Sequence, residues 1–212
     1  MLIKGLYCIT PENIKFSYEE IAENVCRANI DILQFRNKIL NDNEFYKISL
    51  NLRNITLKYN VKFIINDRCE IALRVNADGI HLGQRDLIEK ARYLNNLKEK
   101  NMIIGISTHN IEEINIAKKY TPDYISIGPI FPTPLKPEYM VVGVEFIKKV
   151  KKLTDIPIVT IGGINENNIE DVLKNGADAI AVIRAIFEKN SLDEMFMSAE
   201  RLKNKIKKYD NN

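Results

Sequence analysis

The chain has 212 residues, of which 45% are hydrophobic and 28% charged, and its formal net charge is +3. This length suits one well-packed domain of ordinary soluble composition, so we expect a single domain over residues 1–212. The net charge is too small to imply a nucleic-acid partner by itself, and no stretch approaches the roughly 18 apolar residues of a membrane-spanning helix. The first residues lack the pattern of a secretory signal peptide, which favours a cytoplasmic location.

Eight short apolar runs alternate with longer amphipathic stretches along the chain. Each run is rich in β-branched residues and nearly continuous in apolar character, which is typical of a parallel strand covered on both faces. The predicted strands are residues 2–9, 30–35, 61–65, 79–82, 102–106, 124–127, 156–161 and 179–183.

The stretches between these runs have the apolar spacing of helices. The predicted helices are residues 18–28, 44–58, 67–75, 87–97, 111–119, 144–152, 166–174 and 191–208. Ser17, Asn110, Asn165 and Ser191 stand at predicted helix starts, where their side chains would cap the first turn. Eight strand–helix units predict an α/β fold, a single-domain (β/α)8 TIM barrel. The alternative is an open doubly wound sheet, which usually carries a glycine-rich turn after its first strand, and none follows here.

A TIM barrel carries its active site at the C-terminal strand ends, so the residues that close each strand are the candidates. The second strand ends in Gln34-Phe35-Arg36-Asn37-Lys38. In extended backbone Gln34, Arg36 and Lys38 point the same way. An amide and two cations on one face favour a polyanion, because Arg offers a planar fork and Lys a point charge. The alternative is a charged surface loop.

Two aspartates follow the third and fourth strands. Asp67 comes after Asn66, and Asp86 comes shortly after His81. Two carboxylates on neighbouring strand ends predict a Mg²⁺ site, because this ion prefers oxygen ligands and keeps substrate phosphates in its shell. Each aspartate also stands where it would cap a helix, and the two roles are compatible. A histidine late in a strand is typical of a packed residue rather than of a catalyst.

The remaining strand ends carry hydroxyls, a long loop and glycines. Ser107 closes the fifth strand, and the sixth runs into a Pro- and Gly-rich loop over residues 128–136. We expect this loop to be a mobile flap that brings Lys136 over the substrate, the alternative being an ordinary surface loop. Gly162-Gly163 and Ile183-Arg184 follow the last two strands, where this fold often binds phosphate, and glycines leave backbone N–H groups accessible.

One rim is therefore predicted to carry two anion sites of different construction. The first is cationic and metal-supported, and the second is built mainly from backbone. A diphosphate with Mg²⁺ at the first site and a phosphomonoester at the second would fit the joining of two phosphorylated small molecules, with diphosphate as leaving group.

The motifs resemble those of the thiamine-phosphate synthase family over nearly the whole chain. They are residues 6–10, 34–38, 66–68, 77–86, 128–133 and 161–164. The resemblance implies a transferase that joins hydroxymethylpyrimidine diphosphate to hydroxyethylthiazole phosphate and releases diphosphate, with Mg²⁺ as cofactor. It also implies that the bond to diphosphate largely breaks before the thiazole nitrogen attacks. Such a step needs no general base, because that nitrogen has a lone pair and no proton to lose.

The resemblance also implies residue roles. Asp67 and Asp86 would bind Mg²⁺, and the catalytic groups would be Arg36, Lys38, Ser107 and Lys136. The pyrimidine diphosphate would contact Gln34, Phe35, Arg36, Asn37, Lys38, Asn66, Ser107 and Lys136. The thiazole phosphate would contact Thr133, Pro134, Leu135, Gly163, Ile183 and Arg184. Two departures concern this second set, because many members have Thr-x-Thr-Lys at residues 133–136 and a Ser in place of Arg184.

Three other functions are alternatives. The related thiazole tautomerase, an isomerase of the same fold, typically lacks the aspartate pair and has a His where this chain has Pro129. A non-catalytic barrel that binds a phosphorylated ligand is a second alternative. A sugar-phosphate isomerase is a third, and it would need a Glu or Lys base at a strand end. The expected partners are small-molecule substrates, with no nucleic acid and no membrane, and a homo-oligomer is left open.

Overall fold

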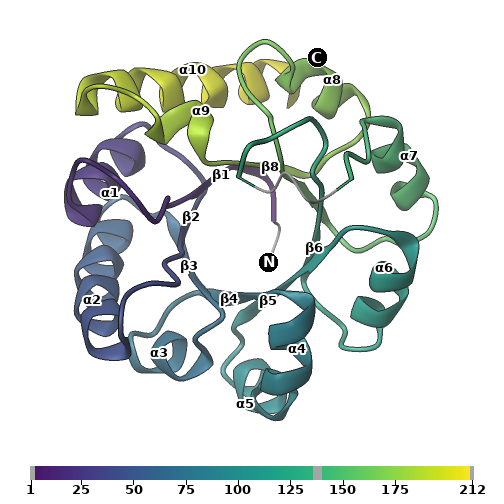
Figure 1. The fold of residues 1–212 in the computed structure, drawn as a ribbon, viewed down its shortest axis with the longest axis horizontal. Coiled ribbons are helices and arrows are strands. Elements are labelled where there is room, and N and C mark those ends of the chain that lie inside the picture. The colour runs from purple at the N-terminus through teal and green to yellow at the C-terminus, as the bar shows by residue number, and fades with distance from the viewer. Residues whose placement is uncertain (1–2, 136–139, 211–212) are drawn as a thin grey trace.

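The computed structural model describes residues 3–135 and 140–210. Its eight parallel strands form a closed barrel in which each strand pairs with the next and β8 pairs with β1. The helices surround this barrel as an outer ring (Figure 1). The predicted (β/α)8 fold is therefore confirmed.

The strands lie within or beside the eight apolar runs. They are β1 (Gly5–Ile9), β2 (Ile32–Phe35), β3 (Lys62–Asn66), β4 (Gly79–Leu82), β5 (Ile103–Thr108), β6 (Tyr124–Ile127), β7 (Ile158–Thr160) and β8 (Ala179–Val182). Strand β1 begins three residues after the predicted start at residue 2, and β5 continues two residues past the predicted end at 106. Strand β5 does so because Ser107 and Thr108 still pair with Ser126 and Ile127 of β6.

Several helices are shorter than the sequence predicts, and one predicted helix is divided into separate elements. They are α1 (Tyr18–Arg27), α2 (Asp42–Lys58), α3 (Cys69–Arg74), α4 (Gln84–Lys90), the 3₁₀ turn η1 (Ala91–Tyr93), α5 (Leu94–Glu99), α6 (Ile111–Lys118), α7 (Glu145–Lys151), α8 (Ile169–Lys174), α9 (Arg184–Phe187) and α10 (Leu192–Asp210). The prediction of one helix over 87–97 is wrong, since α4, η1 and α5 occupy that stretch. The short α9 was not predicted.

Side-chain caps explain where several helices begin. Ser17 and Glu20 form a capping box on α1, and Asn110 accepts a hydrogen bond from the backbone N–H of Glu113 at the start of α6. Helix α2 begins two residues before the predicted position, because Asn41 forms a capping box there. The predicted cap at Asn165 is wrong, because α8 starts only at Ile169.

Asparagine also ends helices in this chain. Asn29, Asn60, Asn76 and Asn101 follow the C-caps of α1, α2, α3 and α5, and their φ angles lie between 50° and 57°. Asn and Gly adopt this left-handed conformation at the lowest cost. The abundance of asparagine in the sequence therefore has a structural use.

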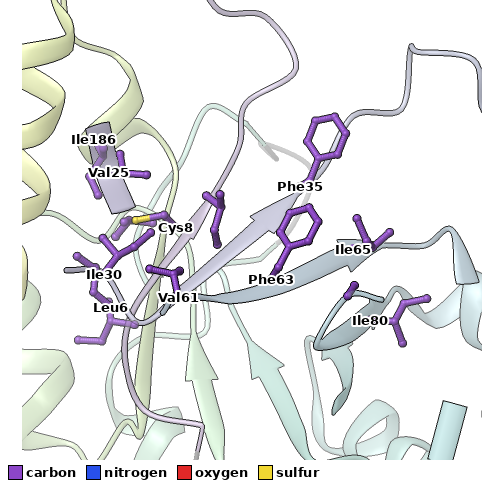
Figure 2. Close-up of a cluster of buried hydrophobic side chains, with 14 of the residues drawn as sticks. Leu6, Cys8, Val25, Ile30, Phe35, Val61, Phe63, Ile65, Ile80 and Ile186 are labelled. Atoms are coloured by element: carbon purple, nitrogen blue, oxygen red, sulfur yellow. The ribbon is translucent and has the colours of Figure 1, made fainter. Parts of the chain in front are cut away.

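The core has two layers, because alternate residues of each strand face opposite sides of the barrel wall. Tyr7, Ile64, Tyr124 and Val159 belong to the cluster inside the barrel. The larger cluster lies between strands and helices, and Figure 2 shows part of it, including Leu6, Cys8, Phe35, Phe63 and Ile65. Toward the C-terminal ends of the strands the buried residues also include Gln34, Asn66 and His81, and the site begins there.

The opposite end of the barrel carries a fourfold repeat that the sequence analysis missed. An aspartate precedes each even-numbered strand, and its carboxylate accepts the N–H of a residue at the start of the odd-numbered strand before it. Asp31, Asp78, Asp123 and Asp178 bond in this way to Leu6 (2.7 Å), Phe63 (2.7 Å), Ile104 (2.8 Å) and Ile158 (2.7 Å). Cations from outer helices pair with three of them: Lys203, Arg53 and Lys151. This end is built for stability, as is usual in the fold.

Candidate active site

Two cations and two carboxylates meet at the ends of β2, β3 and β4. Lys38 Nζ lies 3.6 Å from Asp67 Oδ2, and both Lys38 and Arg36 contribute to the electrostatic environment of Asp67. Asp86 is close enough to Asp67 that, after burial, its charge is the second cause that raises the pKa of Asp67. The four predicted groups therefore lie near one another, as parallel strand ends on one rim require.

Asp67 is held in an unusual conformation. Its φ is 61°, which is costly for a non-glycine residue and is often found at functional sites. The backbone is held there by hydrogen bonds from Asp67 N to His81 O (2.9 Å) and from Arg68 N to Asn66 O (2.8 Å). The side chain accepts from Asn66 Nδ2 at 2.5 Å.

The cations near Asp67 only partly offset the effects that raise its pKa. Burial and then the charge of Asp86 raise the pKa of Asp67, while Lys38, the Gly83 N–H and Arg36 lower it in part. Helix capping does not explain either aspartate. The N-cap positions are Arg68 for α3 and Gly83 for α4, and Asp86 lies in the first turn of α4.

Arg36 is tied to a loop residue that the sequence analysis missed. Arg36 Nη1 donates to Glu12 Oε1 at 2.9 Å, and the backbone N–H of Lys38 donates to the same oxygen at 3.3 Å. Thr10 Oγ1 both accepts from Arg36 N (2.9 Å) and donates to Arg36 O (3.2 Å). The loop after β1 therefore fixes the strand end that carries both cations. No local pattern marks Glu12, which shares an ordinary loop with one other charged residue, Lys15.

The structure separates the five residues 34–38 into two faces. Gln34 is buried inside the barrel and donates from Nε2 to Tyr7 Oη at 2.6 Å. Phe35 is fully buried on the helix side and stacks on Phe45, with ring centroids 4.2 Å apart.

The side chain of Asn37 is also buried and hydrogen-bonded within the protein. Its Oδ1 accepts from the N–H groups of Ile39 and Leu40, and its Nδ2 donates to Tyr18 Oη. The side chains of Phe35 and Asn37 are therefore engaged in packing and in shaping the loop, and their contacts with the substrate stay predictions.

A chain of hydrogen bonds crosses the barrel interior below the rim. Tyr7 Oη lies 2.8 Å from Tyr124 Oη, which lies 2.9 Å from His81 Nδ1. His81 Nε2 lies 2.8 Å from Ser107 Oγ, and Gln84 Nε2 donates to Ser107 O at 2.5 Å. Ser107 is thus hydrogen-bonded at both its hydroxyl and its backbone carbonyl. His81 is a hydrogen-bonded interior residue, as expected, but the sequence did not reveal its contact with Ser107.

The glycine pair after β7 is required by packing. A Cβ on Gly162 would lie 2.5 Å from Pro129 Cα, and one on Gly163 would lie 2.6 Å from Pro132 O. Phe131 N donates to Gly162 O at 3.0 Å, so a backbone hydrogen bond joins the loops that follow β6 and β7. The expected flap is therefore anchored over residues 129–132. Lys136, predicted to act from this loop, is outside the described residues.

The residues predicted to bind the thiazole phosphate lie on the loops after β6, β7 and β8. Thr133, Pro134 and Leu135 end the described part of the first loop, with Leu135 exposed. Arg184 begins α9, and its Nε donates to Glu188 Oε1 at 2.5 Å in an exposed ion pair. Its guanidinium is therefore directed along its own helix. Substrate binding by this set stays a prediction.

Known proteins with the same sequence pattern and barrel identify the family. The model of the thiamine monophosphate synthase family matches residues 6–186 of the chain. The chain belongs to this family. The thiamine-phosphate synthase of Persephonella marina is 39% identical over 204 residues, which cover 94% of each protein. That of Methanospirillum hungatei is 42% identical over 185 residues, which cover 86% of this chain and 89% of the relative.

A solved structure agrees with these relatives. The thiamine phosphate pyrophosphorylase from Pyrococcus furiosus superposes with a TM-score of 0.86 at 34% identity, covering 97% of this chain and 96% of the other. The predicted family is therefore confirmed, and with it the predicted transferase class. Within the described residues, no helix is both long and apolar enough to cross a membrane.

Proposed function

We propose that this protein joins hydroxymethylpyrimidine diphosphate to hydroxyethylthiazole phosphate, giving thiamine phosphate and diphosphate. The observation that carries the proposal is the meeting of Arg36, Lys38, Asp67 and Asp86 at the ends of neighbouring strands. Cations and a metal-binding carboxylate pair side by side suit a diphosphate that must leave with its charge stabilised. The family membership supports the same reaction.

The residues present fit Mg²⁺. Burial and then the charge of Asp86 raise the pKa of Asp67, and a bound divalent cation would offset the repulsion between the two carboxylates. The described part of the chain contains no group of three or more His, Cys, Asp or Glu side chains suited to a metal. A pair of carboxylates is the set expected for Mg²⁺, which keeps waters and substrate phosphate oxygens in its shell. When bound, the ion would neutralise charge on the departing diphosphate.

The side chains of this chain would bind and orient the leaving group. Arg36 keeps one nitrogen on Glu12, and its planar guanidinium carries further N–H donors for phosphate oxygens. Lys38 adds a mobile point charge, since its side chain is 56% exposed. Lys136, outside the described residues, would complete the cationic set from the sixth loop. No general base is required, which agrees with a rim whose conspicuous ionisable groups are cations and metal-type carboxylates.

The thiazole phosphate would lie on the side of β7 and β8. Gly163, Ile183 and Thr133 would offer backbone groups and a hydroxyl, and Arg184 would exchange its pair with Glu188 for the phosphate. Because that pair is exposed, breaking it costs little.

A two-substrate assay tests the proposal. Purified protein with both phosphorylated precursors and Mg²⁺ should form thiamine phosphate, and EDTA should abolish the product. Asp67→Asn should lower turnover at least about tenfold and weaken the Mg²⁺ dependence, because it removes a charged ligand. Asp155→Asn, at an exposed loop position, is the matched control. A folded protein that forms no product from both precursors would refute the proposed reaction.

A further inference from the structure

The buried chain of hydroxyl and imidazole groups inside the barrel has no role in the proposed function as stated. It runs from Gln34 through Tyr7, Tyr124 and His81 to Ser107, with successive donor–acceptor distances of 2.6, 2.8, 2.9 and 2.8 Å. These five residues come from β2, β1, β6, β4 and β5, so the chain crosses the barrel interior between strands that are not neighbours. Two predicted substrate-binding residues, Gln34 and Ser107, stand at its ends.

The order of donors and acceptors along the chain follows from its first member. Gln34 Nε2 donates to Tyr7 Oη, so Tyr7 has its single proton left for Tyr124. Burial raises the pKa of both tyrosines well above the usual range, so each keeps its hydroxyl proton. Tyr124 receives a proton from Tyr7 and must donate its own to His81 Nδ1. A ring nitrogen that accepts carries no proton, so this order of hydrogen bonds places the ring proton on Nε2, facing Ser107.

This order of donors and acceptors determines the hydrogen-bonding role of Ser107. Its Oγ accepts from His81 Nε2 at 2.8 Å, and the Ser126 hydroxyl approaches it as a second donor at 3.5 Å. With its oxygen serving as acceptor, the Ser107 hydroxyl proton is left to point away from both neighbours. Ser107 is partly exposed at the end of β5, whereas His81 and Ser126 are buried.

We propose that the Tyr7–Tyr124 pair fixes His81 with its proton on Nε2, and that His81 is thereby a positioning residue that makes Ser107 a hydrogen-bond donor to the ligand. The ligand atom opposite Ser107 is then an acceptor, such as a ring nitrogen or a phosphate oxygen, and not an amino group. The opposite order of the chain would make Ser107 an acceptor and would select an amino group instead. The inference relies on the proposed function only for the identity of the ligand.

The shape of the interior supports a fixed geometry. A Cβ on Gly105 would lie 2.0 Å from Tyr124 Cζ, so the tyrosine ring fills the space that this glycine leaves. The Tyr124 ring also stacks on His81, with centroids 5.6 Å apart and an interplanar angle of 21°. Gln84 holds the Ser107 carbonyl from the other side. Neither His81 nor Ser107 is therefore free to turn without moving its neighbours.

Nitrogen NMR tests the proton position directly. The sequence holds two histidines, so ¹⁵N-histidine labelling gives two imidazole rings, and His109→Gln leaves only the signals of His81. We expect a protonated Nε2 and an unprotonated Nδ1 in the otherwise wild-type protein. A proton on Nδ1 alone, on both nitrogens, or exchanging equally between them would overturn the inference. This measurement needs no substrate, so it stands or fails separately from the proposed reaction.

Kinetics of Tyr124→Phe test the consequence. This variant keeps the ring beside Gly105 and removes the donor to His81, so His81 should populate both tautomers. The KM for the pyrimidine diphosphate should rise about tenfold, the loss expected for one misdirected hydrogen bond, with the KM for the thiazole phosphate nearly unchanged. Ser49→Ala is the control, because it removes a buried hydroxyl bond to Phe45 O in α2, away from the interior chain. Equal changes in both KM values, or none, would contradict the positioning role. If Tyr124→Phe does not fold, the histidine spectrum of the His109→Gln protein still decides.

Discussion

Replacing Gly163 by alanine tests whether the glycine pair serves the packing of two rim loops. Gly163 has a φ of 65°, and an added Cβ would lie 2.6 Å from Pro132 O and 2.8 Å from Phe131 Cβ. Gly143 offers a matched control, since its φ is 75° and no heavy atom lies within 4 Å of its Cβ position. Both variants share the left-handed strain of about 1–2 kcal/mol, but only the first crowds a neighbouring loop.

The crowding has a calculable minimum cost. The β6 loop must retreat, which breaks the bond from Phe131 N to Gly162 O, and a lost backbone hydrogen bond costs about 1 kcal/mol or more. For a chain of this size, that corresponds to a melting temperature roughly 2–4 °C lower for Gly163→Ala than for Gly143→Ala.

Thermal unfolding followed by circular dichroism measures this difference, and steady-state kinetics locate its effect. The KM for the thiazole phosphate should rise several-fold in Gly163→Ala, with a smaller change for the pyrimidine diphosphate. Equal melting temperatures for the two variants would show that the β6 loop does not depend on the absence of a Cβ at residue 163. The packing explanation of the glycine pair would then be wrong.

Three further substitutions probe charge and stability. Folding raises the pKa of Asp67, so the folded state holds its proton more tightly, and metal-free stability should fall as pH rises from the ordinary value through the raised one. Asp67→Asn should therefore increase the melting temperature of the metal-free protein at neutral pH and abolish stabilisation by Mg²⁺; a lower melting temperature would contradict the raised pKa. Asp78→Ala should lower the free energy of unfolding in urea by about 2–4 kcal/mol without changing either KM, because it leaves the Phe63 N–H and Arg53 without their partner. The control Asp171→Ala, at an exposed position, should lower it by less than about 0.5 kcal/mol. Arg184→Ser should leave stability within about 0.5 kcal/mol, because the pair with Glu188 is exposed, but should raise the KM for the thiazole phosphate. An unchanged KM would show that Arg184 pairs with Glu188 and does not bind the thiazole phosphate.

The order of strands and the main polar groups of the rim follow from the sequence alone. Short apolar runs separated by helical patterns require a parallel sheet, and parallel strands place all their C-terminal ends on one side. Arg36, Lys38, Asp67 and Asp86 could therefore be assigned to one site without coordinates. Local caps such as Ser17 and Asn110 were readable for the same reason, since each acts within a few residues of its own position.

Contacts between residues distant in the chain were decided only by the tertiary structure. The Tyr7–Tyr124 contact joins residues 117 positions apart, and the bond from Arg36 to Glu12 spans 24 positions, so no local spacing announces either one. Gly163 shows the difference most clearly. Its permissive backbone was evident from the sequence, and phosphate access was the expected reason. The structure instead gives a packing reason, because the loop that occupies the space of its missing Cβ arrives from another strand.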